Sequence, residues 1–131
     1  MITGLSIHQH LRDALLSSAS LRSRVGERIY SIAAVNGTAY PFVLCTRTAV
    51  APDYTKDGWN GDLVTVAIEV VSRSSAEAVA IAEDVREALE ESVIEHLDYT
   101  VSETMLVSAT EGYDLDTDTY VEALQFSIKI S

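Results

Sequence analysis

Apolar and polar side chains alternate along the chain between Leu63 and Ser72. The positions expected on the buried face are Val64, Val66, Ile68 and Val70. Alternation with a period of two residues predicts a β-strand with one apolar face. Directly after this strand, apolar residues recur at steps of three and four residues, which predicts an amphipathic helix that lies on the sheet. We expect this strand and this helix to form the centre of the fold.

The start of that helix carries a capping signal. Ser74 and Glu77 have the spacing of a capping box, in which the Ser74 hydroxyl accepts from the Glu77 backbone N–H and the Glu77 carboxylate accepts from the Ser74 backbone N–H. The helix is therefore expected to begin at Ser74. Its apolar stripe consists of Ala78, Ile81, Ala82, Val85, Ala88 and Leu89.

The rest of the chain contains further periodic segments separated by turn signals. We expect a helix over 5–18, a helical turn over 21–25 that Gly26 stops, and strands over 28–32, 41–48, 99–110 and 119–130. The segments 51–61 and 111–118 are rich in turn residues and are expected to be polar connections. This order of elements predicts one α+β domain over residues 1–131, with a mainly antiparallel sheet and two helices on one face.

Two strands near the end of the chain have assignable faces. In the strand over 119–130, the inward side chains are expected to be Leu124, Phe126, Ile128 and Ile130. The alternation in 99–110 is weaker. There, Val101 and Met105 are expected on the face opposite to Thr104 and Leu106.

Cysteine content and hydropathy indicate the class of protein. Cys45 is the single cysteine of the 131-residue chain and lies in an apolar run, so we expect no disulfide within the chain and a reduced, cytosolic setting during folding. The Met1 end has no pattern of a secretory signal, and no stretch has the length and apolarity of a membrane span. We therefore expect a soluble protein with no membrane partner.

The charge is unevenly distributed. Residues 1–65 have a net charge of +1 and residues 66–131 a net charge of −12, within a total of −11. An acidic second half argues against binding to a phosphate backbone. A solvated, solubilising face explains this charge, and a surface for a partner is the alternative. Glu90, Glu91 and Glu95 lie near the helix C-terminus, where the macrodipole disfavours negative charge, either by accident or because an external contact requires it.

The acidic run Asp114-x-Asp116-x-Asp118 resembles the first half of a calcium-binding loop. An EF-hand loop needs glycine at its sixth position and glutamate at its twelfth, but Thr119 and Gln125 stand there. A solvated turn is therefore favoured over a loose surface calcium site.

The remaining reactive residues form no recognisable site. His8 and His10 are two residues apart on an expected helix, so they point in different directions and cannot grip one metal ion. His96 lies near a helix end, and Cys45 has no base paired with it by a motif. We expect no catalytic residue, no metal and no cofactor, and hence no enzyme.

The connection 52–61 contains the only tryptophan. An aromatic side chain on a long arm is a common interface anchor. We therefore take Asp53, Tyr54, Lys56 and Trp59 as candidate interface residues. The alternative is that Trp59 folds back over its own sheet.

Four segments together resemble a known family. They are LxxxVGERIY at residues 21–30, YPFV at 40–43, GD at 61–62 leading into a strand, and SAEAVAIAEDVREAL at 75–89. In this order they resemble the small phage and prophage tail-completion proteins, which are similar in fold to the tail terminators of long-tailed phages. The resemblance extends to the closing strand, although Ser31 stands where the family often has proline.

The resemblance implies a structural protein of the virion tail, assembled in the host cytoplasm. Such a protein forms a ring, commonly a hexamer, at the head-proximal end of the tail tube, where it ends tube growth and presents a surface for head–tail joining. The implied partners are further copies of the chain, the tail tube protein and the head connector protein. DNA would pass through without specific binding, and no catalytic residue carries over.

Two hypotheses about surfaces follow. A ring through which DNA passes should repel phosphate, so part of the acidic half is expected to face the channel. The candidate lumen residues are Glu87, Glu90, Glu91 and Glu95. The exposed sheet edges and the segment 52–61 are candidates for contact with a neighbouring subunit or the tail tube. The alternative function is a monomeric cytosolic binding module that holds a peptide or small ligand on the sheet.

Overall fold

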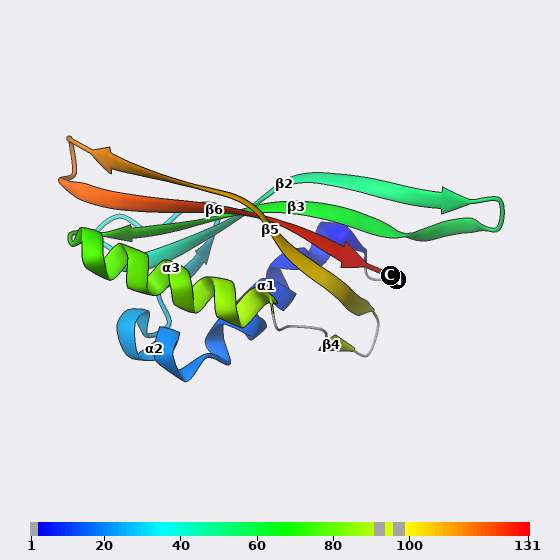
Figure 1. Cartoon of the computed structure of the whole chain (residues 1–131), viewed down its shortest axis with the longest axis horizontal. Helices are drawn as coiled ribbons and strands as arrows, with labels where there is room; N and C mark the ends of the chain where they lie inside the picture. The colour runs from blue at the N-terminus through cyan, green and yellow to red at the C-terminus, as the bar shows by residue number, and fades with distance from the viewer. Residues whose placement is uncertain (1–2, 91–93, 96–98) are drawn as a thin grey trace.

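The computed structural model describes residues 3–90, 94–95 and 99–131 (Figure 1). The elements are η1 (Gly4–Ser6), α1 (Ile7–Leu16), α2 (Ala19–Val25), β1 (Ile29–Ser31), β2 (Phe42–Thr55), β3 (Gly58–Ser72), α3 (Ser75–Glu90), β4 (Ile94–Glu95), β5 (Thr100–Asp114) and β6 (Thr119–Ile130). Gly26 caps α2 at a φ of 60°, which fits the predicted stop.

The strands in the described part of the chain form one six-stranded sheet in the order β1-β2-β3-β6-β5-β4. Strand β1 pairs with β2 in parallel, and every other neighbouring pair is antiparallel. Helices α1, α2 and α3 lie on one face of the sheet, and α2 is a short second helix rather than a single turn (Figure 1). The predicted α+β class with a mainly antiparallel sheet is confirmed.

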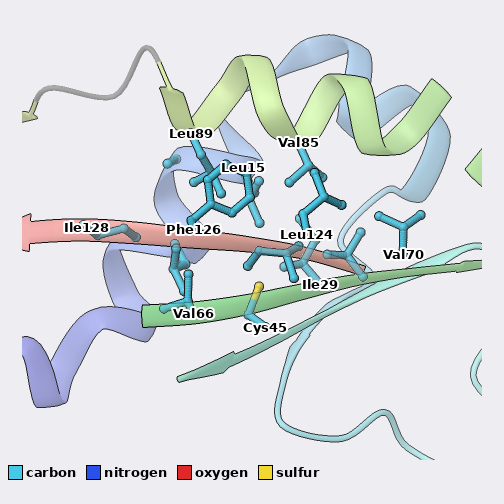
Figure 2. Packing of buried hydrophobic residues seen from close by; sticks show 14 of the residues in the cluster. Leu15, Ile29, Cys45, Val66, Val70, Val85, Leu89, Leu124, Phe126 and Ile128 are labelled. Carbon is cyan, nitrogen blue, oxygen red and sulfur yellow. The ribbon is translucent and has the colours of Figure 1, made fainter. Parts of the chain in front are cut away.

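The hydrophobic core lies between α3, α1 and the central strands β3 and β6 (Figure 2). The predicted inward residues of β3 and β6 are all buried, from Val64 to Val70 and from Leu124 to Ile130. Helix α3 adds Ile81, Val85 and Leu89, which have no exposed surface. Each such side chain contributes roughly 1.5–3 kcal/mol when it leaves water, so this layer holds the sheet and helices together.

The cap of α3 differs from the predicted box in one bond. The Glu77 backbone N–H donates to Ser74 Oγ at 3.3 Å, as predicted. The Ser74 N–H donates to Ser72 Oγ at 3.1 Å instead of to Glu77. Ser72 Oγ in turn donates to Glu77 Oε1 at 2.7 Å, so a hydroxyl from the end of β3 stands between the two partners of the expected bond.

The prediction of a polar connection over 51–61 is wrong. Strands β2 and β3 continue through it as a hairpin, with Tyr54 opposite Trp59 and Thr55 opposite Gly58. Asp57-Gly58 is a hairpin turn signal. Gly58 adopts a φ of 112°, at which a residue with a side chain would have a strained backbone. The turn residues therefore close a hairpin rather than open a loop.

The second expected connection is shorter than predicted for a similar reason. Strand β5 runs on to Asp114, so only four residues from Leu115 to Asp118 make the turn into β6. Figure 1 shows this β5–β6 hairpin projecting at one end of the long axis and the β2–β3 hairpin projecting at the other. The molecule is therefore an elongated sheet with an arm at each end.

The two faces of β5 are not the ones that simple alternation predicts. Register shifts occur between Val101 and Glu103 and between Leu106 and Ser108. After the first shift Thr104 becomes buried and Met105 becomes exposed, and Leu106 packs on the core. A β-bulge moves the following residues to the other face, which alternation alone cannot predict.

Candidate assembly interface

Asp62 lies at the base of the β2–β3 hairpin and is only 3% exposed. Its Oδ2 accepts from the Gly4 backbone N–H at 2.7 Å, and its Oδ1 accepts from Trp59 Nε1 at 2.9 Å. The indole of Trp59 is thus held against its own hairpin and is partly buried, which corresponds to the folded-back alternative. The sequence indicated Asp62 only as part of the GD motif at 61–62 and gave it no structural role, because its contact with Gly4 joins residues that are 58 positions apart.

Trp59 nevertheless lines an open apolar groove of about 390 Å³. The lining residues are Thr3, Leu5, Val50, Pro52, Tyr54, Trp59 and Asp62. Tyr54 is 68% exposed and Leu5 is 63% exposed. The groove lies between η1 and the β2–β3 hairpin, and apolar surface remains uncovered there.

The other two candidate interface residues lie apart from the groove lining. Asp53 accepts from Asn60 Nδ2 at 3.0 Å, and Lys129 Nζ lies 3.7 Å from its Oδ2. Lys56 is exposed in the hairpin turn. The structure therefore brings Tyr54 and Trp59 together in one groove. Asp53 and Lys56 lie on the same hairpin but outside the groove lining.

The candidate lumen residues that the structure describes lie on the exposed side of α3. Glu87 and Glu90 are exposed and line a shallow depression of about 260 Å³ with Glu83 and Arg86. Arg86 Nε lies 3.3 Å from Glu90 Oε1, so one of these carboxylates is partly neutralised. Glu91 and the side chain of Glu95 lie outside the described residues, as does His96.

The β5–β6 hairpin brings two carboxylates face to face, which sequence reasoning missed. Glu111 and Glu122 are register partners. Partial burial and the neighbouring Glu111 raise the pKa of Glu122 above its ordinary value. The pair could have been found from the sequence only if the four-residue turn had been placed correctly, because that turn sets the register.

The tip of this hairpin is organised by its own side chains. Tyr113 donates a hydrogen bond to Asp118, and its ring lies 5.1 Å from that of Tyr120. The Asp116 N–H donates to Asp114 Oδ1 at 3.0 Å. These contacts are those of a solvated turn, the structure that the sequence favoured over a calcium site. Across residues 3–90, 94–95 and 99–131, no three or more His, Cys, Asp or Glu side chains are grouped so that they could hold a metal ion.

Among the described residues, His10 and Cys45 are buried and His8 is half-buried. His10 has no exposed surface, and burial together with the nearby Arg47 charge lowers the pKa of His8. Cys45 is 2% exposed, and burial raises the pKa of its thiol to about 12. The thiol is therefore protonated at neutral pH. Within the described part of the chain, no helix combines the length and the apolarity that crossing a bilayer requires.

Comparisons with known proteins agree with this architecture. The family model described as "Tail completion protein gp17" matches residues 9–131. A chain in the solved structure titled "Virion of native gene transfer agent (GTA) particle" is similar in fold, with a TM-score of 0.80, 21% sequence identity, and coverage of 92% of this chain and 90% of that one. No curated protein matches. Because the family model spans nearly the whole sequence, this chain belongs to the tail completion protein gp17 family.

Proposed function

We propose that this chain forms a ring at the head-proximal end of a tail tube, ends the growth of the tube and presents a surface for the head connector. Family membership supports the coarser conclusion, which is a structural role in a phage-like tail. The observation that carries the proposal is the pair of hairpins at opposite ends of one sheet (Figure 1). A ring requires two different contact surfaces on opposite sides of each subunit, and this shape supplies them.

The apolar groove on the β2–β3 hairpin supports one of these contacts. Tyr54 and Trp59 offer large aromatic surface there, and aromatic residues are enriched in the buried centres of interfaces. Asp53 and Lys56 lie outside the groove, where an interface has its polar rim. This surface would contact a neighbouring subunit or the tail tube protein.

The acidic side of α3 supports a channel that does not hold DNA. Glu83, Glu87 and Glu90 gather on one exposed stretch of helix, and carboxylates repel phosphate. We propose that the ring is a hexamer, as the family resemblance implies, and that this stretch faces its lumen together with Glu91 and Glu95. A map of the surface potential of an assembled ring tests this orientation, and a basic or neutral lumen would overturn it.

In this account the chain acts by shape and by contacts, without a catalytic step or a bound cofactor. It assembles in the host cytoplasm, ends in the virion tail, and contacts copies of itself, the tube protein and the connector. No membrane takes part.

The test mixes the purified chain with purified tail tubes and examines tube lengths and tube ends by electron microscopy. We expect rings on one end of each tube and no further elongation when tube protein is added. A chain that remains a monomer at every concentration and leaves tubes bare would instead fit a monomeric binding module.

Two variants locate the contact surface. Trp59→Ala and Tyr54→Ala remove aromatic surface from the groove, and we expect both to cap fewer tubes. Circular dichroism and thermal unfolding confirm that each variant is folded. Normal capping by Trp59→Ala would show that the groove is not the contact.

A further inference from the structure

Leu115 is the most exposed large apolar side chain in the described part of the molecule, at 81%. It stands in the turn between β5 and β6, at one end of the long axis (Figure 1). Asp114, Asp116 and Asp118 surround it in the sequence. The fold gives Leu115 no place in its own core, so its burial requires another molecule.

The groove lined by Tyr54 and Trp59 lies toward the opposite end, on the β2–β3 hairpin. Its volume of about 390 Å³ exceeds that of a leucine side chain, and most of its lining residues are apolar. An exposed leucine and an apolar groove at opposite ends of one molecule match in hydropathy, and the groove is large enough for the side chain. A contact between them would bury both surfaces.

Two cations stand close to the groove, and three aspartates stand beside Leu115. Arg47 lies beside the groove, since its Nη1 donates to the Leu5 carbonyl oxygen at 2.8 Å, and Lys56 lies in the turn beyond Tyr54. Neither cation takes part in an ion pair among the described residues. Asp57 offsets Lys56 in part, while Asp53 is paired with Lys129. The carboxylate of Asp62 in the groove lining is buried and accepts hydrogen bonds from Gly4 and Trp59. The aspartates beside Leu115 would therefore meet Arg47 and Lys56 as the free charges near the groove.

We propose that Leu115 of one copy of this chain inserts into the Tyr54–Trp59 groove of the next copy. The two surfaces differ and lie at opposite ends, so the contact is heterologous and repeats around a closed ring. This inference rests on the proposed function and deepens it, because it assigns the groove to a neighbouring subunit rather than to the tail tube.

Cysteine cross-linking tests the contact in the full-length protein. The variant Pro52→Cys/Leu115→Cys carries one thiol in the groove and one at the opposite tip. Cys45 is retained because it is buried and protonated, and the parent chain controls for it. Oxidation is carried out where the parent chain forms rings, in solution or on tail tubes. A disulfide requires the two Cα atoms to lie within about 7 Å.

We expect the double variant to give a covalent ladder of chains up to the full ring. A mixture of the two single variants should give a dimer that contains one chain of each. Rings that form without either product would overturn the inference and leave the ring proposal intact. A photo-reactive maleimide attached to the thiol of Pro52→Cys that couples to the tube protein on irradiation would assign the groove to the tube and overturn the inference. Bare tubes and no rings would refute the proposed function, and the inference with it.

A substitution at the tip gives an independent reading. Leu115→Ser should weaken each contact between neighbouring subunits by about tenfold, which corresponds to roughly 1.4 kcal/mol, and the losses multiply around the ring. Val35→Ser is the matched control, because Val35 is 73% exposed and lies in the segment between β1 and β2, which belongs to neither hairpin. Leu115→Met should retain assembly. Equal assembly by Leu115→Ser and Val35→Ser would contradict the contact.

Discussion

At the scale of single residues, Asp62 connects strand β3 to the N-terminal segment, which is distant in the sequence. Its carboxylate holds the N-terminal segment at Gly4, the indole of Trp59 and its own strand β3. Desolvation of a buried carboxylate is costly, but two donors to its oxygens offset that cost. Gly4 must approach closely for this, since a Cβ there would lie 2.6 Å from a Val64 methyl carbon.

The variant Asp62→Ala should therefore lower the free energy of unfolding by about 2 kcal/mol, because it leaves the buried Gly4 N–H without its acceptor. Urea unfolding followed by the fluorescence of Trp59, the only tryptophan, measures the change. The native emission should also shift, because the indole loses its partner. Asp57→Ala, in the exposed turn, is the control and should unfold like the parent chain. Equal stability of the two variants would contradict the role of Asp62.

Cys45 should be inert in the folded protein. Its thiol pKa of about 12 leaves almost no thiolate at mildly alkaline pH, and burial blocks access. A chromogenic thiol reagent should show no reaction in buffer and one equivalent in denaturant, where the thiol regains its ordinary pKa. Rapid modification in buffer would mean that the strand β2 opens readily.

At the scale of elements, the two hairpins place opposite demands on their glycines. Gly61 has a φ of 125°, and a Cβ there would lie 2.5 Å from the Ile130 carbonyl oxygen. Gly112 has open space around the position of a Cβ and lies in the regular strand β5. The first glycine is needed where β3 meets the end of β6, and the second is not.

Gly61→Ala should therefore destabilise the chain by roughly 2 kcal/mol or more, through strain at positive φ and the clash with β6. Gly112→Ala should leave stability unchanged or raise it by about 0.5 kcal/mol, since alanine restricts the unfolded strand more than glycine does. Thermal and urea unfolding of the pair measure both effects. A Gly61→Ala chain as stable as Gly112→Ala would show that the start of β3 does not pack closely against the end of β6.

The carboxylate pair on the β5–β6 hairpin predicts a pH effect. The pKa of Glu122 is raised in the folded chain, so between 4.5 and that higher value the folded state binds more protons than the unfolded state. Stability from this group therefore falls as the pH rises through that window. Glu122→Gln should be more stable than the parent at neutral pH and should lose less stability between acidic and neutral pH. Glu69→Gln, on β3 beside uncharged register partners, is the control.

The sequence predicted those elements whose periodicity is regular. β3, β6 and α3 have strict periods, and their buried faces were predicted correctly because burial on one side imposes the pattern. The hairpin arms were missed because they are not buried on one side, so no regular apolar pattern marks them. Residues 51–61 and 111–114 lie beyond the body of the fold, mostly exposed, so their pattern is polar although their backbone is paired.

The candidate site was predictable only in part. Trp59 and Tyr54 were chosen as interface candidates because aromatic residues stand out in a polar segment, and the structure places them in one groove. Asp62 and Leu115 were not, because each matters through a distant partner or through position at a hairpin tip. The bulges in β5 escaped for a physical reason too, since an extra residue in a strand leaves no fixed mark in composition.

At the scale of the whole molecule, the two ends differ in shape and the two halves of the sequence differ in charge. Its shape ends in two different arms, and its net charge divides between a neutral half and an acidic half. The helices cover one face of the sheet, so the arms and the sheet edges remain for contacts with other chains (Figure 1). These features fit a subunit that acts in contact with other chains of an assembly.

The central claim is that copies of this chain meet end to end in a ring on the tail tube. Electron microscopy of tubes reconstituted with the full-length chain, at a resolution that traces β-strands, tests it most directly. The account predicts a closed ring at one tube end, with the β5–β6 tip of each subunit in the Tyr54–Trp59 groove of the next and Glu87 and Glu90 facing the channel. Subunits that sit on the tube without touching one another, or a ring joined through the helical face with both arms free, would contradict it.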